Sequence, residues 1–228
     1  MKLLKYFLAV IVTAVICVLG VRWHYTGRVI SRRTAGSVIM DGYYRVKHSM
    51  FINAPVNEGC IVFLGDSLTD WLSLNELLPG VNVINRGIAG DTTIGVLNRL
   101  DEVIRHKPAK IFLLIGTNDI AMGMSERKLA GNIREIISKI HEGSNGSKIY
   151  LQTLIPVNSK YMGYRHNMKI EAVNDMIRRI AAEIDCTLVD LYEIFAEEGE
   201  LPLKYTFDGL HINGEGAQKW IDFIRPLL

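Results

Sequence analysis

The sequence predicts an α/β domain in which a five-stranded parallel sheet carries helices on both faces. Short apolar runs of strand length recur five times without polar–apolar alternation, which is typical of strands buried on both faces. Segments with apolar residues at helical spacing separate these runs, and such strand–helix alternation gives a parallel sheet joined by right-handed crossovers. We therefore expect a ligand to bind beyond the carboxyl ends of the strands.

The individual strands and helices follow from these two patterns in chain order. The runs that we expect to form the strands are Ile61–Leu64, Val81–Ile84, Ile111–Ile115, Ile149–Ile155 and Thr187–Leu191. The stripes that predict helices between them are Ile94, Leu97, Leu100 and Ile104; Leu129, Ile133, Ile136, Ile137 and Ile140; and Ile170, Val173, Ile177, Ile180 and Ile184. We expect a last helix to begin with Asn213 as its cap and to run through Trp220 to the C-terminus.

The N-terminal part of the chain differs from this domain in composition. Tyr6 to Val21 are sixteen residues without a charge or a proline, and Lys5 and Arg22 flank them. As a helix they would span about 24 Å, just short of the hydrocarbon core of a bilayer. We expect an uncleaved membrane anchor, with the domain outside the cytoplasm, in the periplasm or at the cell surface; a cleaved signal and a buried helix are the alternatives. The predicted parts are an apolar signal or anchor segment (1–22), a basic linker (23–40) and the α/β domain (41–228).

Composition and charge exclude several classes of protein. The chain has 228 residues, of which 49% are hydrophobic and 22% charged, as in a globular protein and unlike disordered or collagen-like chains. The formal charge is +2, but six of the 26 basic residues lie in residues 1–40, which contain no acid. The remaining 20 basic residues face 24 acidic ones, so a basic surface for nucleic acid is not supported.

The cysteines and histidines give no metal-binding pattern. Cys17 lies in the apolar segment, and Cys60 and Cys186 each stand beside a predicted strand, where we expect them to be small buried residues. The chain has no Cys-x-x-Cys, no His-Glu-x-x-His and no tight carboxylate cluster, so we expect neither a metal nor a cofactor.

A serine follows the first predicted strand, in the segment Gly-Asp-Ser-Leu-Thr-Asp that ends at Asp70. Ser67 would begin the next helix, where free N–H groups and a positive partial charge favour a nucleophile that forms an oxyanion-bearing intermediate. The alternative is that Ser67 merely caps that helix.

Glycines and an asparagine follow the next two strands. After the second strand, Gly90 can bring a bare backbone N–H to a substrate oxygen, or it can belong to a turn before a helix capped by Asp91 or Thr92. After the third strand, the Asn118 amide can donate to a developing oxyanion or form a turn.

Asp208 and His211 stand three residues apart near the C-terminus. At this spacing a carboxylate can accept from one imidazole nitrogen while the other faces a nucleophile, as in a Ser-His-Asp triad. The other histidines have no such partner pattern, and we expect them at the solvated surface: His24, His48, His106, His141 and His166.

Taken together and in this order, the four segments resemble the SGNH, or GDSL, hydrolase family. The marker residues of that family correspond to Ser67, Gly90, Asn118 and His211, and the resemblance covers about residues 41–228. The chain is most similar to the branch of platelet-activating-factor-acetylhydrolase-like and lysophospholipase-like esterases. The resemblance implies a three-layer α/β/α, flavodoxin-like domain that hydrolyses esters through an acyl-enzyme.

The resemblance also implies a role for each residue. Ser67 would attack the acyl carbon, His211 would carry the proton, and Asp208 would hold the histidine tautomer. The backbone N–H groups of Ser67 and Gly90 and the Asn118 amide would bind the oxyanion. Asp66 and Asn85 would be supporting hydrogen-bonding residues rather than reactants.

We expect a short-chain acyl group, above all acetyl, on a small ester or an O-acetylated carbohydrate. A lysophospholipase or thioesterase acting on longer chains, and an O-acetyltransferase with the same site, are alternatives, and the oligomeric state is open. A magnesium-dependent phosphatase is disfavoured because Leu68 stands where the second acidic residue of its motif would be. A non-catalytic binding module is disfavoured because every side chain that the catalytic triad requires is present. Two long loops, Asn158–His166 and Phe195–Thr206, either border the site, with Tyr161 and Tyr164 as candidates to stack on a sugar, or are ordinary surface loops.

Overall fold

A computed structural model describes residues 41–162 and 165–228. The predicted anchor and linker, residues 1–40, lie outside the described residues. Contacts divide the chain into two units, Met1–Arg45 and Val46–Leu228, and the second unit is the domain described below. Among the described residues, no helix combines the length and the apolar character needed to cross a membrane.

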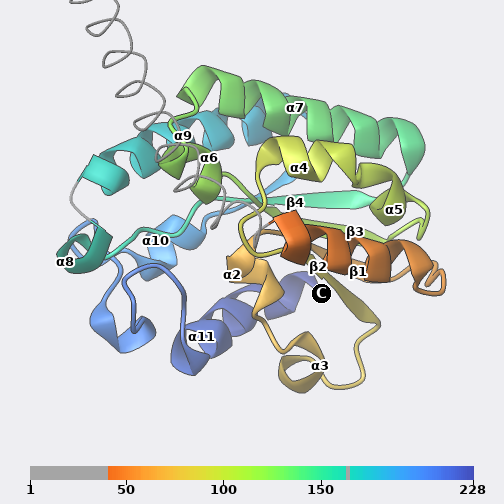
Figure 1. The fold of residues 1–228 in the computed structure, drawn as a ribbon, viewed down its shortest axis with the longest axis horizontal. Helices are drawn as coiled ribbons and strands as arrows, with labels where there is room; N and C mark the ends of the chain where they lie inside the picture. The colour runs from red at the N-terminus through yellow and green to blue at the C-terminus, as the bar shows by residue number, and fades with distance from the viewer. Residues whose placement is uncertain (1–40, 163–164) are drawn as a thin grey trace, which may run out of the picture. The chain divides into compact units, whose positions relative to one another are not determined.

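The core of the domain is a single sheet of five parallel strands (Figure 1). The strands are β1 (Ile61–Gly65), β2 (Val83–Gly87), β3 (Lys110–Leu114), β4 (Lys148–Gln152) and β5 (Thr187–Val189). Their order in the sheet is β2-β1-β3-β4-β5, so the chain steps from β1 to one side and then returns to the other. This reversal leaves a crevice at the carboxyl ends of β1 and β3, where ligands bind in open α/β sheets. The predicted fold class is confirmed.

Helices cover both faces of the sheet (Figure 1). They are α2 (Ser67–Asp70), α3 (Leu74–Leu77), α4 (Thr93–Asn98), α5 (Leu100–Ile104), α6 (Thr117–Ala121), α7 (Glu126–Gly143), α8 (Ser159–Met162), α9 (Arg165–Glu183), α10 (Leu191–Phe195) and α11 (Gly214–Ile224). The helices α4, α5 and α9 all contact α7 and form the layer on one face, while α11 lies on the other. A further helix, which the sequence pattern did not predict, ends at residue 53.

The two long helices and the last one bury the stripes expected of them. All five apolar residues of the α7 stripe are fully buried, as are the four stripe residues that lie within α9; Ile184 follows the end of α9 and is half-buried. The Asn213 side chain accepts a hydrogen bond from Gly216 N at 3.1 Å and so caps α11. Trp220 is fully buried and donates to Gln152 Oε1 at 2.8 Å, which fixes α11 to the sheet.

The second, fourth and fifth predicted strands have clearly different limits in the structure. The fifth ends at Val189, and Leu191 is the first residue of α10. The second begins at Val83 rather than Val81 and continues through Arg86 to Gly87, because backbone pairing with β1 persists where the side chains become polar. The fourth ends at Gln152, so the apolar residues up to Ile155 follow the strand rather than belonging to it.

The predicted stripe after β2 is wrong as a single helix. The chain forms α4 and α5 instead, with a break at Arg99, and Ile94 is 45% exposed rather than buried. The break accompanies the burial of Arg99, which donates to Asp91 Oδ2 at 2.8 Å and to two backbone carbonyls, Arg86 O at 2.8 Å and Gly65 O at 3.2 Å. The spacing of apolar residues along the chain gives no indication of such a buried ion pair.

The expectation that His106 is solvated is also wrong. Its side chain is fully buried and lies 3.1 Å from an Arg86 nitrogen, while its Nδ1 accepts from Asn57 N at 2.9 Å. Burial, together with the positive charges of Arg86 and Arg105, lowers the pKa of His106 to about 4, so the ring is neutral at pH 7. Cys60 is fully buried and Cys186 half-buried, and neither forms a disulfide.

Candidate active site

Ser67 lies directly after β1, at the first residue of α2. Asp66 is the N-cap of this helix, and its Oδ1 accepts from Leu68 N at 3.0 Å. The turn is tight: a Cβ on Gly65 would lie 2.3 Å from the Leu114 carbonyl oxygen, so only glycine fits there. Because Asp66 caps the helix, the Ser67 hydroxyl is left for another partner, and the alternative in which Ser67 is the cap is wrong.

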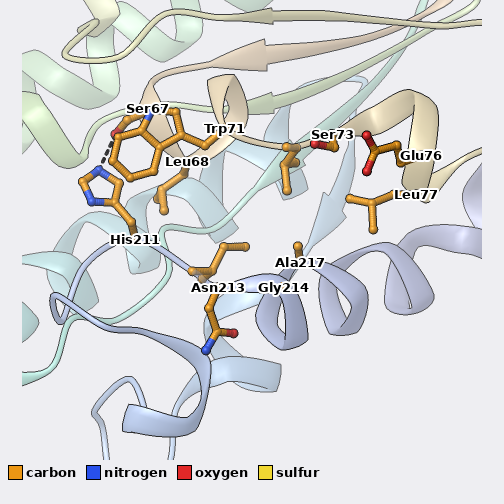
Figure 2. A pocket seen from close by; sticks show the side chains of 12 residues that line it. Ser67, Leu68, Trp71, Ser73, Glu76, Leu77, His211, Asn213, Gly214 and Ala217 are labelled. Carbon is orange, nitrogen blue, oxygen red and sulfur yellow. Dashed lines mark hydrogen bonds between the residues drawn. The ribbon is translucent and has the colours of Figure 1, made fainter.

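That partner is His211, which lies 144 residues further along the chain. His211 Nε2 is 2.9 Å from Ser67 Oγ, and His211 Nδ1 is 2.6 Å from Asp208 Oδ2. Figure 2 shows the Ser67 hydroxyl and the imidazole facing each other at one end of a pocket. The three side chains thus form one hydrogen-bonded line from carboxylate to hydroxyl, which can move a proton from the hydroxyl to the imidazole.

Asp208 is held by its own loop. Its Oδ1 accepts from the backbone N–H groups of Leu210 and His211 at 2.9 and 2.8 Å, and from the Thr206 hydroxyl at 3.3 Å. Partial burial acts in the opposite direction, but the hydrogen bonds from the His211 ring and from the two N–H groups lower the pKa of Asp208 to about 2. The carboxylate is therefore ionised at neutral pH and can orient the imidazole.

Trp71 is a site residue that the sequence analysis missed. Its ring centroid lies 3.9 Å from that of His211, with the planes inclined by 30°. Its side chain is nevertheless 59% exposed, so it covers the imidazole and still offers an aromatic surface to solvent (Figure 2). The only signal in the sequence is that Trp71 follows the Gly-Asp-Ser-Leu-Thr-Asp segment directly.

Gly90 lies in the loop between β2 and α4 with φ of +81°, a conformation that favours glycine. The neighbouring Ala89 N donates to Asp70 Oδ2 at 3.0 Å, and Lys47 Nζ donates to the other oxygen of Asp70 at 2.6 Å. Within residues 41–162 and 165–228, the backbone N–H groups of Ser67 and Gly90 have no protein acceptor. Both donors are therefore available to a ligand oxygen.

Asn118 lies at the start of α6, after Gly116, whose φ is +135°. Its Nδ2 donates to the carbonyl oxygen of Asp91 at 2.9 Å. An amide nitrogen carries two hydrogens, so this contact orients the group and leaves one hydrogen for a further acceptor. The side chain is half-buried, which is compatible with access from the crevice.

Three buried carboxylates, Asp66, Asp91 and Asp119, each adjoin one of these donor residues in the sequence. Asp91 is paired with Arg99, while Asp119 accepts from Thr93 N and, at 2.5 Å, from the Thr93 hydroxyl. The Oδ2 atom of Asp66 has no hydrogen-bond partner within the described part of the chain. Burial raises the pKa of Asp66 to about 7, assisted by the negative charges of Asp91 and Asp119 and opposed by the Leu68 N–H.

Asn85 joins β2 to the segment that follows Ser67. Its Nδ2 donates to the carbonyl oxygens of Thr69 at 2.7 Å and Leu72 at 3.2 Å, and its Oδ1 accepts from Gly87 N at 2.8 Å. The amide is thus occupied by backbone contacts. Two buried ion pairs, Arg86–Glu102 at 3.0 Å and Arg99–Glu102 at 3.4 Å, connect β2 and the break between α4 and α5 to Glu102 of α5. The sequence did not predict these pairs.

A pocket of about 370 Å³ opens beside Ser67. Figure 2 shows it running from Ser67 and His211 at one end to Glu76 and Leu77 at the other. The apolar side chains that line it are Leu68, Trp71, Leu72, Leu77, Ile212 and Ala217. Of the three candidate oxyanion donors, Ser67 lines this pocket, whereas Gly90 and Asn118 do not.

The two long loops differ from the expected stacking surfaces. The Tyr161 side chain packs against Gly209, in the loop that carries Asp208, and does not line the pocket beside Ser67. The loop before Thr206 packs on the segment after β4, through a bond from Leu201 N to Val157 O at 3.2 Å. Tyr164 lies outside the described residues. Among the residues that the structure describes, no group of three His, Cys, Asp or Glu side chains could hold a metal.

The sequence and fold were compared with those of known proteins. Residues 63–219 match the GDSL-like Lipase/Acylhydrolase family. Platelet-activating factor acetylhydrolase IB subunit alpha2 from Rattus norvegicus is 29% identical over 188 residues, covering 78% of this chain and 80% of the relative.

Solved structures give the same picture. One from Streptococcus pneumonia, whose name refers to platelet activating factor, has a TM-score of 0.75 and 26% identity and covers 89% of this chain and 98% of its own. A GDSL-like lipase from Bacteroides thetaiotaomicron has a TM-score of 0.72 and 25% identity and covers 81% and 96%.

Proposed function

Since this chain belongs to the GDSL-like lipase/acylhydrolase family and is a carboxylic ester hydrolase, we propose that it hydrolyses acetyl and other short-chain esters, on O-acetylated carbohydrate, through an acyl-enzyme formed on Ser67. The observation that carries the proposal is the hydrogen-bonded line from Asp208 through His211 to Ser67. The catalytic residues are Ser67, His211 and Asp208.

The first half-reaction forms the acyl-enzyme. His211 Nε2 takes the proton of the Ser67 hydroxyl as Oγ bonds to the acyl carbon, and the ionised Asp208 stabilises the imidazolium through Nδ1–H. The carbon–oxygen bond to the alcohol then breaks, and the Nε2 proton goes to the leaving oxygen. In the second half-reaction His211 takes a proton from water as the water oxygen bonds to the acyl carbon. The bond between that carbon and Ser67 Oγ then breaks, His211 returns the proton to Oγ, and the free acid leaves.

The oxyanion of each tetrahedral intermediate needs donors, and we assign this role to three groups that follow β1, β2 and β3 in the chain. The N–H groups of Ser67 and Gly90 have no acceptor within the described residues, and the Asn118 amide has one hydrogen to spare. Removing one such donor typically costs about 3–4 kcal/mol of transition-state stabilisation. Asp66 and Asn85 are positioning residues in this proposal, since their contacts are with backbone groups around Ser67.

Two observations favour a short acyl group and a polar alcohol. The rat relative is named an acetylhydrolase, and its sequence aligns with most of this chain. The Ser67 pocket also becomes polar at its far end, where Ser73 and Glu76 line it. A polar alcohol can give those groups hydrogen bonds, whereas an apolar alcohol would desolvate them at a cost in free energy.

We also propose that residues 1–22 anchor the enzyme in a membrane and leave the domain outside the cytoplasm. The support is the uncharged stretch from Tyr6 to Val21 between basic residues. Fractionation of cells that express the full chain, followed by protease treatment of spheroplasts, whose outer membrane has been opened, tests both parts. Recovery in the soluble fraction, or protection from protease, would contradict them.

The function itself is tested with p-nitrophenyl esters from acetate to decanoate and the full chain in detergent. We expect kcat/KM to fall steeply beyond butyrate, Ser67→Ala to abolish turnover, and Ser138→Ala, at an exposed serine of α7, to have no effect. Turnover that survives Ser67→Ala would refute the mechanism. A preference for long chains would move the assignment to lysophospholipids or thioesters, and acetyl transfer to an added polyol in excess of hydrolysis would indicate an O-acetyltransferase.

A further inference from the structure

A second pocket adjoins the one beside Ser67. It has a volume of about 430 Å³ and lies along α3 and β2, where Asn75, Asn85 and Arg86 line it. The two pockets share the lining residues Leu72, Ser73 and Glu76. They therefore meet at the N-terminal turn of α3, and a ligand that fills the first pocket can continue into the second.

The side chains at this junction have polar groups without a partner among the residues that the structure describes. The side chains of Ser73, Asn75 and Glu76 are exposed, and none of them makes a hydrogen bond or an ion pair within the described part of the chain. Although Ser73 precedes α3, its hydroxyl does not cap the helix. In addition, β2 is an edge strand, so alternate residues turn backbone N–H and C=O groups away from β1. This part of the groove suits a ligand rich in hydroxyl groups.

The chemistry of Ser67 decides which part of the substrate enters the groove. The leaving oxygen must lie within hydrogen-bond reach of His211 Nε2, because that atom returns the proton. His211 and Ile212 line the first pocket, whereas the oxyanion donors Gly90 and Asn118 do not. The pocket is therefore on the side of the leaving alcohol.

Charge and shape narrow the class of alcohol. Glu76 is the ionisable side chain that both pockets share, and Arg86, which lines the second pocket, is paired with Glu102 at 3.0 Å. The groove therefore disfavours phosphate or other anions. The first pocket has an exposed aromatic ring, Trp71, beside the catalytic imidazole, and the second is lined mainly by polar residues. An apolar and aromatic wall next to polar groups at fixed positions is the usual lining of a site for an amphipathic ring such as a sugar.

We propose that the two pockets form one groove that binds the alcohol part of an acetylated oligosaccharide. Trp71 lies against the sugar that carries the acetyl group, and the polar side chains of α3 bind the sugar that follows. The inference rests on the esterase function proposed above and adds to it that the substrate is an oligomer rather than a single sugar.

The test compares substrates with one acyl group and alcohols of different length. Acetate release by the full chain is measured on mono-O-acetylated xylo-, cello- and gluco-oligosaccharides, from the monosaccharide to the hexasaccharide. We expect kcat/KM to rise at least about tenfold from monosaccharide to trisaccharide in one series, as one or two added hydrogen bonds would produce. In the double variant Asn75→Ala, Glu76→Gln this ratio should fall to about one, whereas Glu135→Gln, at an exposed acid of α7, should keep it.

Direct binding provides a readout that is independent of turnover. The Ser67→Ala variant should bind the acetylated trisaccharide more tightly than the monosaccharide in calorimetry, and the added Asn75→Ala and Glu76→Gln changes should remove the difference. Equal kcat/KM at every length in all series, or length dependence unchanged in the double variant, would overturn the inference while Ser67-dependent turnover of p-nitrophenyl acetate upheld the esterase. Loss of length preference together with a preference for decanoate would show that the groove holds an acyl chain, which also overturns it. Turnover that is independent of Ser67 would instead refute the proposed function.

Discussion

The carboxylate of Asp70 accepts a hydrogen bond from the backbone N–H of Ala89 at 3.0 Å. Asp70 is the last residue of α2, which begins with Ser67, and Ala89 directly precedes Gly90. The Asp70 side chain therefore connects α2, which begins at Ser67, to the loop that contains Gly90, next to the backbone hydrogen bond from Ile88 N to Gly65 O at 3.1 Å. Lys47, from the helix that precedes β1, pairs with the same carboxylate at 2.6 Å and holds it in place.

Replacing this carboxylate should lower the rate of the chemical step. In Asp70→Ala the Gly90 loop loses its tether, and we expect kcat on p-nitrophenyl acetate to fall roughly 10- to 100-fold with little change in KM, because small displacements of catalytic groups are costly. Steady-state kinetics of this variant and of Asp101→Ala, at an exposed acid of α5, provide the measurement and its control. An unchanged kcat in Asp70→Ala would show that the loop keeps its position without the tether.

The Asn118 amide is expected to act only when charge develops on the substrate oxygen. Asn118→Ala should therefore reduce kcat by about 10²- to 10³-fold, with KM nearly unchanged. Asn145→Ala, at an exposed loop residue, is the matched control, and circular dichroism establishes that both variants are folded. A rise in KM at constant kcat would instead assign Asn118 to ground-state binding.

Asp208 should affect catalysis strongly and stability weakly. Asp208→Asn replaces the carboxylate that accepts from His211 Nδ1–H by a neutral amide, which no longer fixes the tautomer of the ring. We therefore expect a loss of kcat of roughly 10³- to 10⁴-fold. The pKa of Asp208 is lowered to about 2, so its stabilising effect is complete above the unfolded value near 3.8 and is lost as the pH falls through about 2. Since its side chain is 53% exposed, solvent screening limits this effect to about 1 kcal/mol. Urea unfolding at pH 7 of this variant and of Asp222→Asn, a similarly exposed helical acid, checks the estimate; a much larger loss would contradict it.

Asp66 should make the protein less stable as the pH rises. Its pKa is raised to about 7, so between pH 3.8 and 7 the unfolded chain gives up a proton that the native state retains, and the free energy of unfolding falls. The full change is at most about 4 kcal/mol. Asp66→Asn keeps the oxygen that caps α2 and should remove this fall, which urea unfolding at pH 4.5 and pH 8 measures, with Asp175→Asn as control. The same pH dependence in Asp66→Asn and wild type would contradict the assignment.

Patterns that depend on local burial are readable from the sequence. A strand that is covered on both faces must be apolar throughout, so the composition of Ile61–Leu64 and Ile111–Ile115 alone predicts two central strands. Helices that bury one face repeat their apolar residues every three or four positions, and the α7 stripe behaves in this way. Because parallel strands end at a common edge, chain order alone also brings Ser67, Gly90 and Asn118 toward one place.

Contacts between distant residues leave no such pattern. Arg99 breaks the predicted helix and pairs with Asp91, and His106 is buried against Arg86. Arginine is mostly exposed in proteins and histidine is intermediate, so residue type alone does not indicate this burial. Trp71 would be assigned to an ordinary helix end without its contact to His211. The groove along α3 is lined on one side by residues of α11 and on the other by residues of β2, which are far apart in the chain.

The sequence by itself determined the fold class, which polar residues follow which strand, and the residue types available for acyl transfer. These features are local, because hydrophobic periodicity and turn residues act over a few neighbouring positions. The tertiary structure alone decided which of those residues meet. Packing between segments far apart in the chain produces the 2.9 Å contact between Ser67 and His211 and the ring contact between Trp71 and His211. It also raises the pKa of Asp66. Such interactions depend on distance and burial in space, which spacing along the sequence does not encode.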